Sequence, residues 1–230
     1  MTGYNWDYLD KRAYNNKVGH YKFGRQLEFI KEHGKNRFDT ILDIAGGSGR
    51  FALPLRTYSE DITVIDVNST ALALLEERAE NKIKIIQGDF MEVVIEYKFS
   101  LILCIEAIGY FSDWELFFKK VNRLLSIEGR FIFSYTNPNS WRFFLRKVKN
   151  WKNGFYPYHE MKISELKEML NNCDLEIDTM EGMNWIPFSL TSNNILVSVF
   201  AFIEKVFRLR YWFAQSPWLM ISVNKKTHSV

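Results

Sequence analysis

Hydrophobic residues change their spacing several times along the chain, and each change predicts a new element of secondary structure. Short, nearly continuous apolar runs are typical of strands buried on both faces of a sheet, whereas apolar positions three and four residues apart are typical of helices. The expected strands are residues 40–45, 61–66, 82–88, 99–105 and 130–135. The expected helices between them are residues 49–58, 70–80 and 113–126. This alternation predicts an α/β fold of βαβ units, with a mostly parallel sheet and helices on both of its faces.

The pattern is less regular beyond residue 136. Residues 137–158 hold five basic and seven aromatic side chains and no acidic one. The elements expected after this segment are a helix at 164–172, a strand at 175–180, an amphipathic helix at 189–210 that is basic towards its end, and a strand at 218–223. Because no repeat, low-complexity segment or linker interrupts the chain, residues 1–230 are expected to form a single domain.

The composition excludes several classes of protein. With 230 residues, 47% of them hydrophobic and 25% charged, the chain has the composition of an ordinary globular domain. A net charge of +3 is too small for the dense basic face that binds nucleic acid. Residues 1–19 lack the apolar run of a secretory signal, and the longest apolar run, residues 195–203, is far shorter than the roughly 20 residues of a membrane-spanning helix.

Cysteine and histidine usage gives two further expectations. Cys104 and Cys173 are far apart in the chain and are expected to be reduced thiols of a cytoplasmic protein. The four histidines are scattered, without ligand spacing to cysteine or carboxylate, so no metal site is expected.

Residues 43–50, Asp-Ile-Ala-Gly-Gly-Ser-Gly-Arg, form the most informative stretch of the sequence. A strand that ends in small residues and leads into a helix brings its backbone close to a ligand at the carboxyl edge of the sheet. Gly47 and Gly49 have no Cβ and can adopt dihedral angles that other residues avoid. Turns of small residues also serve tight packing, so this turn alone does not identify a ligand.

Two acidic residues end the next two expected strands. Asp66 lies seventeen residues after Gly49, where a carboxylate can accept hydrogen bonds from both hydroxyls of a ribose. Asp89 ends the third strand, where it can meet the exocyclic amine of an adenine whose ring lies between Val67 and Phe90. Three neighbouring strand ends therefore predict one crevice that binds a nucleoside.

Together these motifs resemble those of the class I S-adenosylmethionine-dependent methyltransferases. Residues 41–49 (ILDIAGGSG) are similar to the family's glycine motif, residues 64–67 (VIDV) to its ribose motif, and residues 87–90 (QGDF) to its adenine motif. Residues 101–110 (LILCIEAIGY) and 124–133 resemble its fourth-strand motif and the lead into its fifth strand. The resemblance implies a Rossmann-like, seven-stranded sheet with an antiparallel C-terminal edge, and S-adenosyl-L-methionine as the cofactor.

The resemblance also implies which residues bind the cofactor and how the domain is organised. Residues 1–37 resemble a helical lid, from which Arg12 and Tyr14 are expected to contact the carboxylate end of the cofactor. Residues 38–136 are the expected cofactor-binding core, 137–160 an acceptor-side insertion, and 161–230 the C-terminal helices and edge strands. The implied cofactor-binding residues of the core are Asp43, Ala45, Gly46, Gly47, Gly49, Asp66, Val67, Asp89, Phe90, Ile105 and Glu106.

One residue departs from the family pattern. Ala45 stands where the family usually has its first glycine. A methyl group is tolerable at this position only if the residue keeps a negative φ. We therefore expect a negative φ at Ala45, and we expect Ala45→Gly to retain cofactor binding. A bulky residue at Gly47 should instead prevent binding.

The methyl acceptor is the least defined part of the expected function. Methyl transfer from a sulfonium is an in-line displacement that depends mainly on orientation, and a hydroxyl acceptor benefits from a nearby base. The candidate catalytic residues are Glu106, Tyr110 and His159, and Glu106 is equally suited to ordering the site. The basic, aromatic segment and the helix at 189–210 suit an anionic small-molecule, sugar or lipid-linked acceptor, or peripheral contact with an anionic membrane.

Two other functions stay open at this point. Residues 47–52 also fit the loose dinucleotide pattern G-x-G-x-x-A, which would indicate a nicotinamide- or flavin-dependent oxidoreductase. Asp43 argues against it, because a carboxylate on the first strand would repel a pyrophosphate. The other is a protein that binds S-adenosylmethionine without transferring its methyl group.

Overall fold

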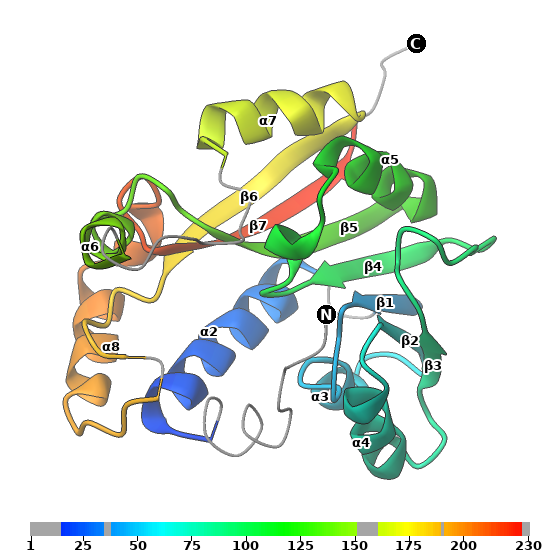
Figure 1. Ribbon diagram of the computed structural model, residues 1–230, viewed down its shortest axis with the longest axis horizontal. Helices are drawn as coiled ribbons and strands as arrows, with labels where there is room; N and C mark the ends of the chain where they lie inside the picture. The colour runs from blue at the N-terminus through cyan, green and yellow to red at the C-terminus, as the bar shows by residue number, and fades with distance from the viewer. Residues whose placement is uncertain (1–14, 35–37, 151–160, 190, 227–230) are drawn as a thin grey trace.

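The apolar runs of the sequence pair into one sheet. The computed structural model describes residues 15–34, 38–150, 161–189 and 191–226, with the side chains of residues 146–150 excepted. In this part of the chain the strand order is β3-β2-β1-β4-β5-β7-β6 (Figure 1). The strands are β1 (Thr40–Ile44), β2 (Asp61–Asp66), β3 (Lys84–Gln87), β4 (Phe99–Cys104), β5 (Leu125–Thr136), β6 (Leu175–Met183) and β7 (Trp218–Lys225). β7 runs antiparallel to the other six strands and lies between β5 and β6. The expected Rossmann-like sheet with an antiparallel C-terminal edge is therefore confirmed.

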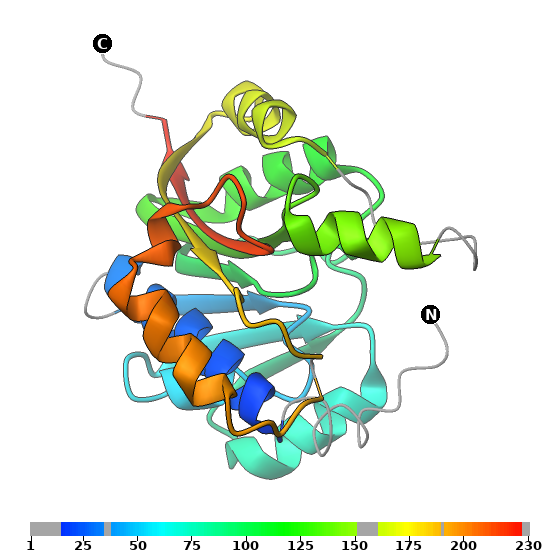
Figure 2. The same cartoon turned by 90° about the vertical axis from the view of Figure 1, so that its left-hand side faces the viewer.

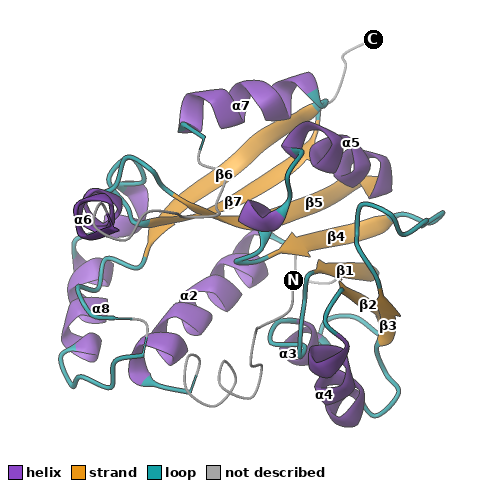
Figure 3. Ribbon diagram, in the orientation of Figure 1, coloured by secondary structure: helices purple, strands orange, loops and turns teal. Residues whose placement is uncertain are grey.

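Helices cover both faces of the sheet, as Figure 3 shows by colour. One face packs against α2 (Lys17–His33), α3 (Ala52–Leu55) and α4 (Ser69–Ala79), and the opposite face packs against α5 (Trp114–Leu124) and α7 (Ile163–Asn172). The other elements are α6 (Trp141–Asn150), α8 (Val197–Val206) and the short 3-10 helices η2 (Ile108–Tyr110) and η3 (Leu209–Tyr211). The expectation of helices on both faces is therefore confirmed.

The amphipathic pattern explains how α5 attaches to the sheet. Its N-terminus is capped by Asp113, whose carboxylate accepts the N–H of Leu116 at 2.9 Å. Its buried residues recur every three or four positions and pack on β5: they are Trp114, Phe117, Phe118, Val121 and Leu124. Full burial of one such large apolar side chain contributes roughly 1.5–3 kcal/mol, so this face alone fixes the helix on the sheet.

The helix expected at residues 49–58 is much shorter in the structure. Gly49 has a φ of +82°, which belongs to a turn and not to a helix. Residues 47–51 therefore form turns, and only Ala52–Leu55 are helical. The carboxyl end of β1 is thus followed by a longer turn than the sequence pattern predicted.

The helix expected at residues 189–210 is also shorter, and it is interrupted. Local side-chain bonds to the backbone precede it, because Ser192 accepts the N–H of Asn194 at 3.2 Å and Asn194 accepts the N–H of Leu196 at 2.9 Å. Such bonds compete with helix formation, and α8 begins only at Val197. The left-handed φ of 51° at Arg208 then separates α8 from η3.

No helix among the described residues combines the length and the apolar character needed to cross a bilayer. Cys104 and Cys173 are both free and buried, and burial raises the pKa of each thiol.

Candidate active site

The carboxyl ends of β1, β2 and β3 meet at one edge of the sheet. Gly47, in the turn after β1, donates its N–H to Oδ2 of Asp66 at 2.9 Å. Gly88 donates its N–H to the backbone oxygen of Asp66 at 3.0 Å, and Asp89 follows directly. The structure therefore brings together the glycine turn and the two acidic residues on which the nucleoside prediction depends.

The turn after β1 leaves little room for side chains. A Cβ on Gly46 would lie 2.7 Å from the carboxylate of Asp43 and 2.9 Å from Cγ1 of Val64. A Cβ on Gly49 would overlap with the side chain of Leu75. Glycine at these two positions therefore lets the turn pack closely against the ends of β1 and β2 and against α4.

The expected conformation of Ala45 is wrong. Its φ is 56°, in the left-handed region, and not negative. The turn imposes this value because the N–H of Ala45 donates to the backbone oxygen of Ile65 at 2.7 Å, and the N–H of Gly46 lies 3.4 Å from the same oxygen. A residue with a Cβ costs roughly 1–2 kcal/mol in this region. Ala45 is therefore a point of backbone strain at the site.

Asp43 and Asp66 bring two buried carboxyl groups to the same turn. Asp66 accepts the N–H groups of Gly47 and Asn68 at 2.9 and 2.8 Å, and burial raises its pKa. Asp43 is only 1% exposed, and its Oδ2 has no hydrogen-bond partner in the structure. Burial, together with the nearby Asp66 carboxylate, raises the pKa of Asp43 to about 7. A cation placed beside Asp43 would favour its ionised form.

Glu106 follows β4 at the same edge and is enclosed by donors. Lys22 Nζ lies 2.7 Å from its Oε2. Arg50 Nη1 and Gln26 Nε2 donate to its Oε1 at 2.9 and 3.0 Å. Burial alone would raise the pKa of Glu106, but the Lys22 and Arg50 charges outweigh it and lower the pKa to about 2. Glu106 is therefore a permanently ionised carboxylate that orders two cations.

The sequence pattern did not predict Lys22, Gln26 or Arg50 as residues of the site. Lys22 and Gln26 are buried and lie one turn apart on α2, so they form a polar pair on the buried face of a helix. Burial lowers the pKa of Lys22, and its ammonium lies 3.9 Å from the centroid of the Trp218 ring. A polar pair on the buried face of a helix could have indicated a buried polar partner. The sequence pattern could not identify that partner, because Glu106 lies about eighty residues further along the chain.

Comparison with known proteins agrees with this geometry. Residues 42–133 match the sequence profile of the family described as "Methyltransferase domain". A ubiquinone biosynthesis O-methyltransferase from Rickettsia bellii is 25% identical over 197 residues, which cover 78% of this chain and 81% of that protein. The enzyme of the same name from Rickettsia akari is 27% identical over 157 residues, covering 64% and 62%.

Solved structures share the fold. A magnesium protoporphyrin IX methyltransferase from Synechocystis, with bound S-adenosylhomocysteine, gives a TM-score of 0.68 at 11% identity, over 96% of this chain and 97% of that one. The N-methyltransferase NodS from Bradyrhizobium japonicum, also with S-adenosylhomocysteine, gives 0.62 at 14% identity, over 96% and 98%.

The matched segment runs from β1 to β5 and contains the glycine turn, Asp66, Asp89 and Glu106. The chain is a class I S-adenosylmethionine-dependent methyltransferase. Its cofactor is S-adenosylmethionine. The sheet also decides against the dinucleotide alternative, because the usual dinucleotide-binding order 3-2-1-4-5-6 lacks the antiparallel strand that this methyltransferase inserts between β5 and β6.

The residues expected to flank the adenine differ in exposure. Asp89 is exposed and its Oδ1 accepts the N–H of Met91 at 2.8 Å. Val67 is more than half exposed, whereas the ring of Phe90 is buried in the core, 5.5 Å from that of Phe117. Of the two expected flanking residues in the methyltransferase, only Val67 presents its side chain to solvent. Their contacts with the cofactor stay predictions.

The remaining expected residues lie in several places. Ile105 is buried beside Glu106 at the end of β4, and Tyr110 is partly exposed at the end of η2. Arg12, Tyr14 and His159 lie outside the described residues, so their expected roles stay predictions.

The acceptor side of the edge contains a buried amide. Asn184 directly follows β6, is fully buried, and has a left-handed φ of 67°. Among the residues that the structure describes, neither its Nδ2 nor its Oδ1 has a hydrogen-bond partner. An unpaired buried polar group costs about 1–3 kcal/mol. Because β6 runs parallel to β4 and β5, Asn184 lies at the same edge of the methyltransferase sheet as Glu106.

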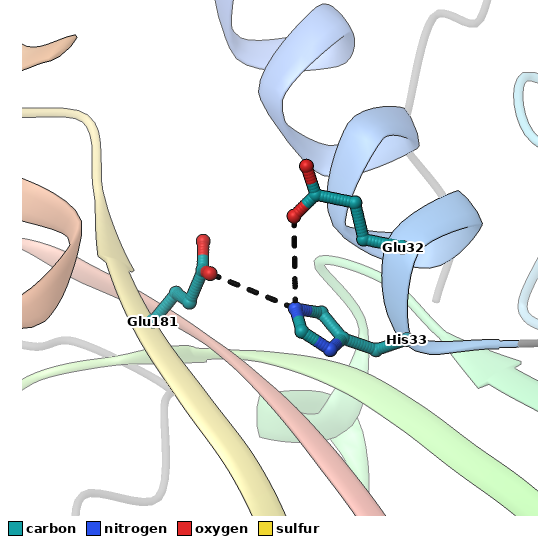
Figure 4. A group of neighbouring side chains, drawn as sticks. All are labelled: Glu32, His33 and Glu181. Carbon is teal, nitrogen blue, oxygen red and sulfur yellow. Dashed lines mark ion pairs between the residues drawn. The ribbon is translucent and has the colours of Figure 1, made fainter.

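Glu32, His33 and Glu181 form a further cluster, drawn in Figure 4, whose spacing would suit a metal ion. His33 Nε2 lies 3.8 Å from Glu32 Oε2 and 3.6 Å from Glu181 Oε1. Arg210 Nη1, however, lies 3.4 and 3.5 Å from these same carboxylate oxygens, and Arg25 Nη2 lies 3.6 Å from the other oxygen of Glu181. The carboxylates already have cationic partners, so the cluster fastens α2 and η3 to β6.

Proposed function

We propose that this methyltransferase transfers the methyl group of S-adenosylmethionine to a hydroxyl oxygen of a small, lipid-linked acceptor. The observation that carries the proposal is the extent of similarity to the Rickettsia bellii ubiquinone biosynthesis O-methyltransferase. It covers 78% of this chain, whereas the matched methyltransferase domain, residues 42–133, is much shorter. The similarity therefore includes segments outside the cofactor-binding core, where acceptor specificity is expected to lie.

The charges at the edge of the sheet support one orientation of the cofactor. Asp66 would accept the ribose hydroxyls, since its two oxygens are already held in place by backbone N–H groups. The sulfonium and ammonium would lie on the side of Asp43, and the cofactor's carboxylate would meet Lys22 and Arg50. The ammonium of Lys22 and the guanidinium of Arg50, both held by Glu106, suit an incoming carboxylate.

Glu106 is a positioning residue in this proposal and not the general base. A group with a pKa of about 2 takes a proton from a hydroxyl very poorly, and three donors already occupy the Glu106 carboxylate. The expected roles of Tyr110 and His159 in proton transfer stay predictions. Orientation of the acceptor supplies most of the rate in such a displacement.

Asn184 is the acceptor-binding residue that we propose from the structure. Its unpaired amide can donate to and accept from a hydroxyl or carbonyl group, and a bound acceptor would supply the missing partners. Arg142, in contrast, is occupied within the protein, because it donates to the backbone oxygens of Ile186 and Phe188 at 2.5 and 2.6 Å. The described part of the 137–160 segment therefore gives Arg142 a structural role, and an anionic acceptor stays a prediction.

The test is transfer of labelled methyl from S-adenosylmethionine to a panel of small acceptors. The panel contains hydroxylated aromatic rings and the matching amines, each with and without a prenyl tail. We expect label on the hydroxyl compounds, with the lower KM for those that carry the tail. Label found on amines alone, or no turnover with any acceptor despite cofactor binding, would refute the proposal.

A matched variant tests the acceptor contact. Asn184→Gly keeps the left-handed backbone available and removes the side chain together with its amide. We expect a KM for the acceptor at least about tenfold higher, because two hydrogen bonds are lost, with an unchanged Kd for S-adenosylmethionine. An unchanged KM would remove Asn184 from the acceptor site.

A further inference from the structure

Helix α8 is oriented with its one acidic residue inward. Glu204 is 4% exposed and accepts the hydroxyl hydrogen of Tyr21. Its other oxygen lies 3.9 Å from Nε of Arg25. Both partners belong to α2, the helix whose Lys22 and Gln26 hold Glu106. The inner face of α8 thus consists of Glu204 and of Val197, which is buried against Val18 and Ile186. This fixes the rotation of α8 and leaves its other apolar face toward solvent.

An apolar stripe runs along the outer face of α8. Val199, Phe202 and Val206 are spaced three and four residues apart, which places them on one side of the helix, and Ile195 lies in the turn just before α8. All four are exposed, and Phe202 is exposed by 66%. A water-soluble helix normally shows the reverse arrangement, with charged residues outside and apolar residues inside.

The apolar surface continues beyond the helix, and the segment that carries it has a positive net charge. Phe207, Tyr211 and Trp212 are exposed directly after α8, Trp212 by 63%. Between residues 191 and 216 the sequence has no acidic residue apart from the buried Glu204. The cations Lys205 and Arg208 are exposed beside the stripe. Aromatic side chains together with cations, in a segment that has no exposed carboxylate of its own, are typical of a surface that meets anionic lipid headgroups.

The stripe lies on the active-site end of the molecule. The segment containing α8 and η3 joins the end of β6 to the start of β7, and both of these points lie at the carboxyl edge of the sheet. Figure 1 shows α8 and α6 at the same side of the protein, and Figure 2 turns this side toward the viewer. On α6, Phe144 and Leu145 are also exposed. A surface that binds lipid here would therefore face the same region as the cofactor turn.

We propose that the outer face of α8, defined by Val199, Phe202, Val206, Phe207 and Trp212, docks the protein on the surface of an anionic lipid bilayer. The helix would lie in the plane of the interface with Phe202 among the acyl chains and Lys205 at the headgroups. The proposal rests on the proposed function in one respect, since an acceptor with a lipid tail would then be presented at the active-site edge.

Vesicle sedimentation tests this docking surface. The full chain is mixed with phosphatidylcholine vesicles that contain or lack phosphatidylglycerol. We expect the protein to sediment with the anionic vesicles, and Phe202→Glu to reduce its partition coefficient at least about tenfold, because the substitution replaces an inserted ring by a charge. Lys205→Glu should weaken the binding by a few-fold and reduce its dependence on salt.

Two control variants introduce the same kinds of substitution outside the proposed docking surface. Ile127→Glu changes an apolar residue that is 84% exposed near the amino end of β5, at the opposite edge of the sheet. Lys167→Glu changes an exposed cation on α7. Neither should alter sedimentation. Absence of vesicle binding by the wild type, or equal loss in Phe202→Glu and Ile127→Glu, would overturn the proposal.

A second copy of the chain is the competing occupant of this surface. Sedimentation velocity of the same proteins without lipid distinguishes it, because a dimer that Phe202→Glu dissociates, with no vesicle binding, would overturn the lipid proposal. Calorimetric titration with S-adenosylhomocysteine separates this failure from failure of the proposed function. A protein that binds the nucleoside but no vesicles contradicts only the docking surface. A protein that binds vesicles but neither nucleoside nor methyl acceptor contradicts the proposed function.

Discussion

Replacing Asp43 by asparagine should uncouple cofactor binding from pH. Asp43 is fully enclosed, has one oxygen without a hydrogen-bond partner and lies near the Asp66 carboxylate, and these conditions raise its pKa to about 7. In the free protein it therefore binds a proton over much of the neutral range. A cofactor that carries a sulfonium and an ammonium favours the ionised carboxylate, so binding must release this proton below neutral pH.

The size of the effect follows from the pKa. At pH 6 about nine in ten Asp43 side chains are protonated, and removing the proton costs about 1.4 kcal/mol, which weakens the Kd about tenfold. At pH 8 the cost is close to zero. We therefore expect wild-type protein to bind S-adenosylmethionine about tenfold more tightly at pH 8 than at pH 6, relative to Asp43→Asn. The ratio to the variant cancels the titration of the cofactor's own amino group.

Calorimetry in two buffers of different ionisation enthalpy measures both the Kd and the number of protons released. We expect close to one proton released by the wild type at pH 6 and none attributable to Asp43 in the variant. Asp66→Asn provides an internal check, because loss of the neighbouring charge should move the transition to lower pH. If the wild type and Asp43→Asn show the same pH profile, the placement of the cationic end of the cofactor beside Asp43 is wrong.

Further predictions concern the stability of the same turn and its surroundings. The pKa of Asp43 is higher in the folded than in the unfolded protein, so this residue stabilises the fold at low pH and the contribution is lost as the pH rises. Between pH 4 and 8 the unfolding free energy of the wild type should therefore fall by up to about 4 kcal/mol relative to Asp43→Asn, as measured by urea unfolding. Ala45→Gly removes a strained Cβ and should raise the free energy of unfolding by up to about 1 kcal/mol, seen as a higher urea midpoint, with cofactor binding retained; a lower midpoint would contradict the strain. Gly49→Ala places a Cβ against Leu75 at a positive φ and should lower stability by at least about 1 kcal/mol; unchanged unfolding would contradict the close approach. Glu106→Gln leaves the buried Lys22 without its counter-charge and should lower the free energy of unfolding by about 3–5 kcal/mol at pH 7. This loss should shrink as the pH falls through about 4.5 towards 2, where the wild-type carboxylate itself becomes protonated. Equal stability of the two proteins at pH 7 would contradict the ion-pair cluster.

The sequence predicted the parts of the site that depend on local pattern. Gly47, Asp66 and Asp89 each lie at the end of an apolar run, and parallel strands deliver the ends of such runs to one edge. The hydrogen bond between Gly47 and Asp66 is the direct consequence. The mostly parallel sheet and its antiparallel C-terminal edge were likewise predicted, because the resemblance implied them.

Long-range contacts were not accessible from the same pattern. Lys22 reaches Glu106 across more than eighty residues, and Asn184 becomes significant only once β6 is seen to end beside β5 and β7. The φ of Ala45 depended on which carbonyl of β2 its N–H would meet, a matter of register that composition does not specify. The outward stripe of α8 was visible as apolar residues, but its direction depends on the burial of Glu204.

The central claim is that one edge of the sheet, formed by the ends of β1, β2 and β4, holds the cofactor. A crystal structure of the protein with S-adenosylhomocysteine measures this directly. Our account predicts the ribose hydroxyls on the Asp66 carboxylate and the methionine end between Asp43 and the Lys22–Glu106–Arg50 cluster. A nucleoside bound on another surface, or with its ribose away from Asp66, would contradict it.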